Sequence, residues 1–306
     1  MIKTKITFII HGKIKSISTL KSEIESVFSK GYEVRFKITN KFSGAKNGVK
    51  EAIEEKTDII IICGGDGSIN EAVNQFLSSD NSRHIKCGVL PMGTGNDFAK
   101  SLGVKNDIKE LKSLIEIKKV IDVSVFNMKF LDQDQNAISR YFVNIADIGI
   151  GGFAAEKVNN SSKLLGATIT YFKAIISSFL KFKKQPVHLT SDSFEWEGNV
   201  MSLCMANGKF FASGMCIAPD ANICDQQLQL IILGNVSILD YLKNINKVKK
   251  GQKIEHKEVL YTAVNGCKII SKGMPCPIDM DGEFIGYTPL EVELSERKVS
   301  FYGGVL

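Results

Sequence analysis

IIIICGGDGSINEAVN, residues 59–74, is an apolar run that ends in three glycines around one aspartate. A segment that is apolar at every position is typical of a strand covered on both faces of a parallel sheet. Gly64 and Gly65 come next, and glycines let backbone N–H groups approach a ligand because they carry no Cβ. We predict a helix from Ile69, and a helix N-terminus offers free amides and a partial positive charge that suit a phosphate. The stretch therefore predicts a strand, a phosphate-binding loop and a helix.

Asp66 lies in this loop, where a carboxylate by itself is a poor partner for a phosphate. It has a role there if Mg²⁺ lies between the carboxylate and the phosphate. The alternative is a tight turn in which Asp66 caps the following helix. A second loop, in PMGTGNDFAKSLG (residues 91–103), follows the next predicted strand and again precedes a helix. Because ligands bind at the carboxyl ends of parallel strands, two such loops at one sheet edge favour phosphate binding.

The two halves of the chain differ in their hydrophobic pattern. The first 120 residues or so alternate predicted strands (5–10, 32–39, 58–65 and 86–93) with helix-length amphipathic segments, which is typical of a doubly wound parallel sheet. After residues 120–128, short alternating runs punctuated by Gly, Asn and Asp indicate an antiparallel β domain, interrupted by predicted helices over 161–184 and 237–251. We place the boundary near residue 123 and expect the strand at 298–304 to return to the first domain. The expected domains are 1–123 plus 297–306, and 124–296.

Composition excludes several classes of protein. The chain has 306 residues, 44% hydrophobic and 24% charged, with 39 basic and 33 acidic side chains and a net charge of +6. This mild basic excess fits anionic substrates or an anionic membrane surface but decides nothing alone, and we expect no nucleic-acid partner. Seven cysteines without a C-x-x-C pair indicate reduced thiols in a cytoplasmic protein. The N-terminal apolar core of about six residues is too short for a signal peptide, and no run approaches the ~20 apolar residues of a spanning helix.

The two loops resemble the paired signatures of the diacylglycerol kinase catalytic-domain family, which includes bacterial lipid kinases and the sphingosine and ceramide kinases. Further similar motifs follow in the family's order along the whole chain, at TNKFSGA (39–45), IDVSVFN (121–127), APDANICD (218–225) and DMDGEFIG (279–286). Gly-Gly-Asp-Gly alone is shared with NAD kinases and phosphofructokinases, whereas the ordered combination is specific. The resemblance implies an α/β ATP-binding domain followed by a β-sandwich domain for the lipid substrate, with the active site in the interdomain cleft.

The resemblance also implies the site residues. ATP would be held by Thr39, Gly64, Gly65, Asp66, Gly67, Ser68, Ile69, Asn70, Glu71, Gly93, Thr94 and Asn96. Asp66, Asp97 and Asp122 would surround the catalytic Mg²⁺, and Asn222, Asp225 and the backbone carbonyl of Gln227 would hold a structural metal. Glu283 would be the general base, with Asp281 beside it. The implied partners are ATP and a lipid alcohol such as diacylglycerol.

Two positions depart from the family pattern. After the first strand the family usually has Asn-Pro and a Ser-Gly pair that cradles phosphate, whereas this chain reads HGKIKS (11–16) and keeps only Gly12. His11 in this loop could contact phosphate or simply be solvated. The metal loop usually continues Asp-Gly, but here it reads Asp225-Gln226, which is expected to strain the turn and puts the structural metal in doubt.

The chemistry of phosphoryl transfer calls for a carboxylate that takes the proton of the alcohol. Asp281 and Glu283 would face the same side of a strand but diverge in a turn, which leaves one of them for catalysis. Without the upstream loops, the same segment would read as a β-turn with solvated acids. Glu283 is the favoured base, and Asp66 and Asp281 are the alternatives.

Residues 161–184 combine apolar residues at helical spacing with a basic end. The segment could lie on a bilayer surface with its lysines toward anionic headgroups, or it could pack on the β domain with a basic C-terminus that suits the helix dipole. We expect peripheral contact with the inner face of the membrane. The sequence leaves the oligomeric state open, a homodimer being one option.

Two other functions remain open at this point. A soluble-substrate kinase of the NAD kinase type shares the first glycine motif, although GTGNDFA favours the lipid branch. A catalytically silent nucleotide-binding protein would explain the missing Ser-Gly and Asp-Gly pairs. The presence of Asp66, Asp97, Asp122 and Glu283 argues against a silent protein.

Overall fold

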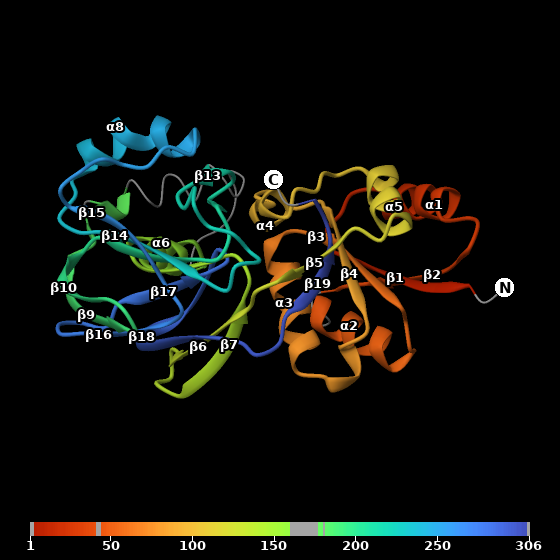
Figure 1. The fold of residues 1–306 in the computed structure, drawn as a ribbon, viewed down its shortest axis with the longest axis horizontal. Helices are drawn as coiled ribbons and strands as arrows, with labels where there is room; N and C mark the ends of the chain where they lie inside the picture. The colour runs from red at the N-terminus through yellow and green to blue at the C-terminus, as the bar shows by residue number, and fades with distance from the viewer. Residues whose placement is uncertain (1–2, 41–43, 160–176, 180, 305–306) are drawn as a thin grey trace. The chain divides into compact units, whose positions relative to one another are not determined.

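The computed structural model describes residues 3–40, 44–159, 177–179 and 181–304 (Figure 1). The chain forms two compact units, the first made of Met1–Val123 and Arg297–Leu306 and the second of Ser124–Glu296. Each unit has its own sheet and its own buried core. The expectation that the active site lies in a cleft between domains stays a prediction.

The first unit is built on a six-stranded sheet in the order β2-β1-β3-β4-β19-β5. Its strands are β1 (Thr4–Ile10), β2 (Tyr32–Ile38), β3 (Ile59–Gly64), β4 (Lys86–Pro91), β5 (Val120–Val123) and β19 (Val299–Tyr302). Five of them are parallel, and only β5 runs antiparallel to its neighbour β19. A strand from the end of the chain thus lies between two strands from its first half.

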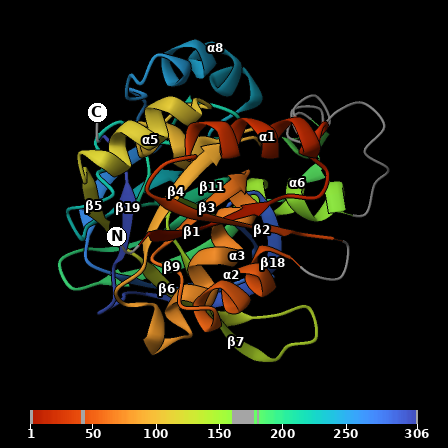
Figure 2. The same ribbon diagram turned by 90° about the vertical axis from the view of Figure 1, so that its right-hand side faces the viewer.

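Helices cover both faces of this sheet, as a parallel sheet requires (Figure 2). They are α1 (Ile17–Val27), α2 (Ala45–Glu54), α3 (Asp66–Leu77), α4 (Asp97–Ser101), α5 (Ile108–Glu116) and the short 3₁₀ turn η1 (Asp80–Ser82). Leu20 and Ile24 of α1 and its C-cap residue Phe28 pack in one core cluster with residues of β1 and β3 and with Ile108 and Leu111 of α5. In Figure 2, α2 and α3 lie on the other side of the strands.

Arg297 anchors the returning C-terminal segment to the first unit. Its guanidinium group donates hydrogen bonds to the carbonyl oxygens of Phe76, Leu77 and Ser79, at 3.1, 2.7 and 3.0 Å. These carbonyls lie at the end of α3, where a helix leaves its last acceptors without helical partners. A cation at this end also complements the helix dipole.

The helix after the first glycine loop begins earlier than predicted. It starts at Asp66 instead of Ile69, and Gly65 is its cap residue. The alternative in which Asp66 caps this helix is therefore wrong. The difference has a local cause, because Gly65 adopts the extended cap conformation and Asp66 enters the first turn, where a negative charge suits the helix dipole.

The second unit is mainly antiparallel. Its main sheet has the order β10-β9-β16-β18-β17-β8-β11-β14-β15, with β6 paired to β18 and β7 to β6. The elements are β6 (Phe126–Leu131), β7 (Ala137–Phe142), β8 (Ile145–Gly149), α6 (Ile150–Asn159), β9 (Gln185–Ser191), β10 (Glu195–Val200), β11 (Ser202–Ala206), β12 (Phe210–Phe211), β13 (Met215–Cys216), β14 (Leu228–Leu233), α8 (Ile238–Lys249), β15 (Val259–Val264), β16 (Cys267–Ser271), β17 (Pro277–Met280) and β18 (Glu283–Leu294). Alternate residues of these strands form the main core of the unit, including Phe126, Ile148, Leu203 and Leu230.

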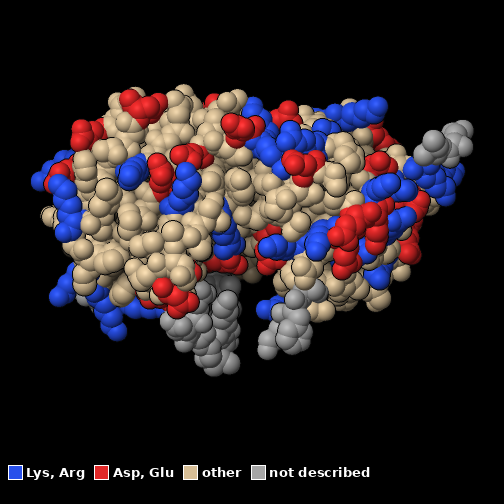
Figure 3. Space-filling view, turned by 90° about the horizontal axis from the view of Figure 1, so that it is seen from below, with Lys and Arg blue, Asp and Glu red and all other residues tan. Residues whose placement is uncertain are grey.

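The sequence predicted a helix over residues 161–184 and no helix that spans a membrane. Most of the predicted helix at 161–184 lies outside the described residues. In the part of the chain that the structure does describe, every helix is too short or too polar to traverse a lipid bilayer. On the face shown in Figure 3, basic and acidic side chains of the first unit are intermingled.

Candidate active site

Four strands of the first unit end at the same edge of the sheet. In the parallel register Ile10 of β1 lies beside Ile38 of β2 and Cys63 of β3, and Gly64 lies beside Pro91 of β4. The loops that follow these strands therefore start side by side. They carry most of the residues predicted to bind ATP, so the structure brings together at this edge what the sequence spreads over about 60 positions.

Thr39 joins the first two of these loops. Its backbone N–H donates to the carbonyl of Ile10 at 2.9 Å, and its side-chain Oγ1 accepts a hydrogen bond from the Gly12 amide at 3.2 Å. A hydroxyl that accepts one hydrogen bond can still donate another. Thr39 thus links the atypical loop after β1 to the end of β2, and its role in ATP binding stays a prediction.

The two glycine loops touch each other through their backbones. A Cβ atom built on Gly93 would lie 2.4 Å from the Cα of Gly65, so the approach requires glycine. Asn96 closes the second loop, since its Oδ1 accepts from the Gly93 amide at 2.8 Å and its Nδ2 donates to the Gly93 carbonyl at 2.9 Å. Asn96 was predicted to bind ATP, and the contacts it makes here shape the loop.

Asp66 connects the first glycine loop to the helix after the second. Its Oδ1 accepts from the Phe98 amide at 2.9 Å and its Oδ2 from the Asp97 amide at 3.1 Å, both in the first turn of α4. Burial raises the pKa of the Asp66 carboxyl above its ordinary value, the two amides oppose this shift, and the charge of Asp97 adds to it. The carboxylate is therefore partly desolvated, and two backbone amides stabilise its negative charge.

Asp97 brings a second carboxylate to the same place. The Oδ2 atoms of Asp66 and Asp97 each lie 3.2 Å from the point where a Cβ of residue 95 would be, and residue 95 is a glycine. Asp97 is buried, and its Oδ1 pairs with Lys100 Nζ at 3.0 Å. Mg²⁺ in phosphoryl-transfer sites is typically held by one or two carboxylates plus substrate phosphates and water. The two aspartates fit that donor set.

Asp122 was expected to lie with Asp66 and Asp97, but its hydrogen-bond partner lies in another part of the sheet. In the sheet it is paired with Ser300, whose Oγ donates to Asp122 Oδ1 at 2.6 Å and accepts from Lys86 Nζ at 3.2 Å. Lys86 begins β4, whereas Asp66 and Asp97 follow the ends of β3 and β4. The structure brings Asp66 and Asp97 together, and the role of Asp122 stays a prediction.

The remaining predicted ATP residues surround the start of α3. Ser68 lies against Gly64, Thr94 is exposed, Ile69 is in the core and Asn70 is buried, where its side chain contacts Asn74. Glu71 reaches the N-terminus of α2, where its Oε2 accepts weakly from the Lys46 amide at 3.4 Å. Ile69 and Glu71 therefore make structural contacts, whereas the exposed Thr94 is accessible to a ligand.

The proposed catalytic acids of the second unit lie on a tight hairpin. Asp281 and Gly282 both have positive φ and connect β17 to β18 as a two-residue turn, a geometry typical of Asp-Gly. Asp281 connects the turn to β8 through two hydrogen bonds. Its amide donates to the Ile145 carbonyl at 2.9 Å, and its Oδ1 accepts from the Ile145 amide at 3.1 Å. Glu283 is nearly half exposed and pairs with Arg140 of β7 at 2.9 Å. The two side chains therefore have different partners, Asp281 the Ile145 amide and Glu283 the Arg140 guanidinium.

The predicted structural-metal loop is closed by its own hydrogen bonds. Asn222 Oδ1 accepts from the Cys224 amide at 3.1 Å, and Asp225 Oδ1 accepts from the Gln227 amide at 2.9 Å. Gln226 has φ 65°, the left-handed conformation that favours glycine. Within the described residues no group of three or more His, Cys, Asp or Glu side chains is arranged to hold a metal. The second metal site stays a prediction.

Comparison with known families adds to this geometry. Residues 5–128 match the family model described as "Diacylglycerol kinase catalytic domain", and residues 144–302 match the model described as "YegS C-terminal NAD kinase beta sandwich-like domain". The second match alone spans more than half of the chain. The chain therefore belongs to the family in which a diacylglycerol kinase catalytic domain is followed by a YegS C-terminal domain.

Its relatives and structural neighbours extend over the full chain. It is 26% identical over 291 residues to a diacylglycerol kinase of Bacillus subtilis, covering 92% of this chain and 91% of that protein, and 25% identical to a "Probable lipid kinase YegS-like" protein of Alcanivorax borkumensis, covering 97% and 96%. A crystal structure of a diacylglycerol kinase from Bacillus anthracis superposes with a TM-score of 0.72 at 19% identity, covering 99% of this chain and 98% of that one. Yeast NADH kinase gives 0.56 at 11%, covering 99% and 84%. The resemblance and the α/β-plus-β fold class are confirmed.

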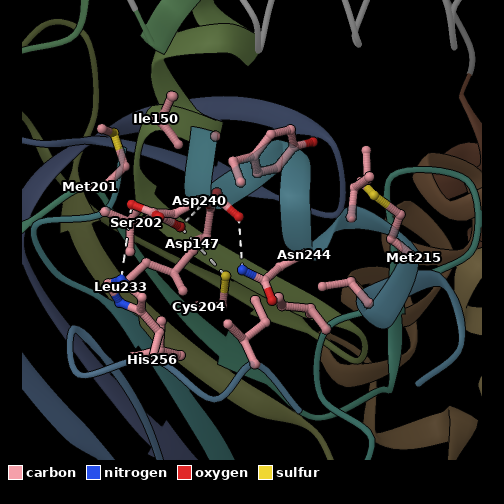
Figure 4. A pocket seen from close by; sticks show the side chains of 18 of the residues that line it. Asp147, Ile150, Met201, Ser202, Cys204, Met215, Leu233, Asp240, Asn244 and His256 are labelled. Atoms are coloured by element: carbon pink, nitrogen blue, oxygen red, sulfur yellow. Dashed lines mark hydrogen bonds and ion pairs between the residues drawn. The ribbon is translucent and has the colours of Figure 1, made fainter. Parts of the chain in front are cut away.

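In this diacylglycerol kinase family member, an apolar pocket lies within the second unit (Figure 4). One wall is the inner face of α8, with Tyr241, Ile245 and Val248, and the opposite side is formed by strands and loops. Most of the remaining lining is aliphatic, aromatic or sulfur-containing, with Ile150, Phe179, Met201, Phe211, Met215, Ile217, Leu233, Val236, Ile254 and Val259. Ligand pockets are mostly apolar with a few polar groups, and this one has that composition.

The polar groups of the pocket come from β8, β11 and α8. Asp147 accepts a hydrogen bond from Ser202 Oγ at 3.1 Å, and Ser202 lies 3.6 Å from Cys204 Sγ. Burial raises the pKa of Asp147 to about 7. At the α8 wall, Asp240 lies 3.9 Å from His256 Nε2 (Figure 4). A few polar side chains, among them a buried acid and a hydroxyl, thus lie in a mostly apolar pocket.

The sequence did not predict the apolar pocket of the second unit. Its lining residues are spread from Asp147 to Val259, and no contiguous motif contains them. One local signal existed in NIADIG, residues 144–149, where Asp147 interrupts a run that is otherwise typical of a buried strand. A buried carboxyl in such a run is rarely placed there for packing, since burying a charge is costly.

Proposed function

We propose that this protein is an ATP-dependent lipid kinase that uses Mg²⁺ and transfers the γ-phosphate of ATP to the hydroxyl of a lipid alcohol such as diacylglycerol. The observation that carries the proposal is the convergence of Asp66 and Asp97 beside two touching glycine loops at one sheet edge. In a member of this kinase family, that edge is the natural binding site for a nucleotide triphosphate.

The residues of the first unit take the roles of binding and positioning. Backbone amides of the glycine loops and the Thr39 hydroxyl bind phosphate oxygens, while Asp66 and Asp97 hold the cation. Bound Mg²⁺ would neutralise charge on the phosphate oxygens, which is the main requirement of phosphoryl transfer. Because the Ser-Gly pair after β1 is missing, more of the phosphate binding falls to the two glycine loops after β3 and β4.

Glu283 is proposed as the general base. Its side chain is nearly half exposed, whereas Asp281 is engaged with Ile145 at both its amide and its carboxylate. Arg140 forms an ion pair with the Glu283 side chain. A substrate hydroxyl that approaches Glu283 has to compete with this ion pair or replace it. Asp281 is then a positioning residue.

The apolar pocket of the second unit supports a lipid acceptor over a soluble one. A hydrocarbon chain gains free energy roughly in proportion to the apolar area it buries, about 25 cal/mol per Å². A dinucleotide would leave the apolar lining without a matching partner, since polar side chains (Asp147, Ser202, Asp240, Asn244 and His256) are a minority of the lining. This distinction separates the proposal from the NAD kinase alternative.

The deciding experiment measures ATP consumption by the purified chain with dioctanoylglycerol, a polyprenol, sphingosine or NAD as acceptor, with Mg²⁺ and with EDTA. We expect Mg²⁺-dependent phosphorylation of a lipid alcohol and none of NAD. Turnover of NAD alone would establish the soluble-substrate alternative, and no turnover with ATP bound would establish the silent one.

A pocket-filling variant tests the acceptor site directly. Ile245 is half-buried and lines the pocket from α8, so Ile245→Trp should raise the KM for a long-chain lipid roughly tenfold and leave the KM for ATP unchanged. Ile138→Trp is the matched control, since Ile138 is exposed on β7 of the same unit and does not line the pocket. Equal lipid KM values for both variants would remove the pocket from substrate binding.

A further inference from the structure

Helix α8 has two faces of different character. Its inner face lines the apolar pocket, whereas its outer face is exposed and carries the docking face defined here as Leu239, Leu242, Lys243, Asn246, Lys247, Lys249 and Lys250 (α8 and the residue after it). Leu239 and Leu242 are 63% and 45% exposed and lie one helical turn apart, so they are neighbours on the helix surface. The outer face therefore combines exposed apolar side chains with basic ones.

The lysines of the docking face lack ion-pair partners in the described part of the chain. Lys243, Lys247, Lys249 and Lys250 form no ion pair there, whereas lysines elsewhere in the same unit pair with carboxylates, as Lys129 does with Glu293 and Lys272 with Glu197. The one acid of α8, Asp240, is turned to the cap residue Ser237 and to His256. Asp240 interacts electrostatically with Lys243, whereas Lys247, Lys249 and Lys250 have no acid of α8 beside them, so the docking face keeps a net positive charge.

We propose that the outer face of α8 docks this protein on an anionic bilayer, with the lysines on lipid headgroups and Leu239 and Leu242 inserted among them. Charge complementarity favours this occupant, because lysines beside exposed apolar residues on one helix face are the pattern of interfacial helices, and anionic leaflets attract such lysines. A helix with its other face on the pocket then lies at the surface from which a lipid would be taken. In that respect the inference rests on the proposed function.

The test measures co-sedimentation with vesicles of phosphatidylcholine alone and of phosphatidylcholine mixed with phosphatidylglycerol. Wild type should bind the anionic vesicles and lose that binding at high salt. Lys243→Gln with Lys250→Gln should weaken binding roughly 10- to 30-fold, and Leu239→Ser with Leu242→Ser roughly tenfold. Lys105→Gln with Lys109→Gln, and Ile117→Ser, are controls on exposed positions of the first unit and should bind like wild type.

A second readout separates this inference from the proposed function. All α8 variants should phosphorylate dioctanoylglycerol supplied without vesicles at the wild-type rate, because the docking face does not line the pocket. If wild type phosphorylates no lipid, the proposed function fails while the vesicle result still stands by itself. Equal binding of α8 variants and wild type to anionic vesicles, or equal binding of wild type to both vesicle types, would overturn the docking face.

Discussion

The carboxyl edge of the first sheet and the apolar pocket of the second unit differ in how the chain builds them. The edge is made of contiguous loops, in which Gly64, Gly65 and Asp66 or Gly93, Asn96 and Asp97 lie within a few positions of one another. The pocket gathers single residues from β8, β11, β14 and α8. Phosphate binding requires a local backbone shape, which a short motif can encode, whereas an apolar volume requires only that distant side chains meet.

The largest effect is expected from replacing Asp66 at the carboxyl edge of the first sheet. We expect Asp66→Asn to lower Mg²⁺-dependent turnover by orders of magnitude, because the amide removes the charge that would hold the cation. The folded state should persist, since burial already raises the pKa of this carboxyl and a neutral side chain removes that cost. Turnover and thermal unfolding measure the two effects. Asp80→Asn, at an exposed acid of the same unit, is the control, and an active Asp66→Asn enzyme would remove Asp66 from the mechanism.

Glu283 tests whether the motif of the second unit takes part in the same chemistry. General-base catalysis contributes roughly 10²–10⁴-fold, so Glu283→Gln should lower kcat on that scale with little change in ATP affinity. Glu293→Gln is a close control, because Glu293 lies on the same strand, is similarly exposed and is also ion-paired. Asp281→Asn should stay near wild-type activity, since an amide oxygen can still accept from Ile145. A crippled Asp281→Asn beside an active Glu283→Gln would exchange the two roles.

Asp147 tests the pocket through folding stability. Its pKa of about 7 lies above the ordinary value, so the folded state binds the proton more tightly than the unfolded state. The wild-type protein should therefore lose stability as the pH rises from about 4 to about 7. Asp147→Asn should unfold at a higher temperature than wild type at pH 8, with the difference shrinking toward pH 4. A pH-independent difference would mean that Asp147 does not titrate in this range.

Gln226 provides the smallest effect and tests the departure in the metal loop. Because φ at this position is 65°, Gln226→Gly relieves a left-handed conformation that costs a non-glycine residue roughly 1–2 kcal/mol, partly offset by the greater freedom of glycine in the unfolded chain. We expect a net stabilisation of less than about 1 kcal/mol by denaturant unfolding. A destabilised variant would show that the Gln226 side chain has a role of its own.

Local patterns predicted much of the first unit but not its finer contacts. The strands at 5–10, 32–39, 58–65 and 86–93 were placed within two residues, because a buried strand such as 58–65 is apolar at every position and the half-buried strand at 32–39 alternates apolar and polar residues. The start of α3 was missed by three residues, since a glycine cap carries no side-chain signature. The contact of Asp66 with α4 was also missed, because it joins residues 31 and 32 positions apart.

The sequence by itself determined those segments whose structure has a local cause. Apolar runs became strands, glycine pairs became loops at strand ends, and the order of motifs indicated the family. The resemblance already implied that Asp66 and Asp97 share one site, whereas the tertiary structure alone decided that amides of α4 bind Asp66, that Asp122 pairs with Ser300, and that Asp147 lies in an apolar pocket under α8. These contacts depend on sheet order and helix packing, which no neighbouring residues encode.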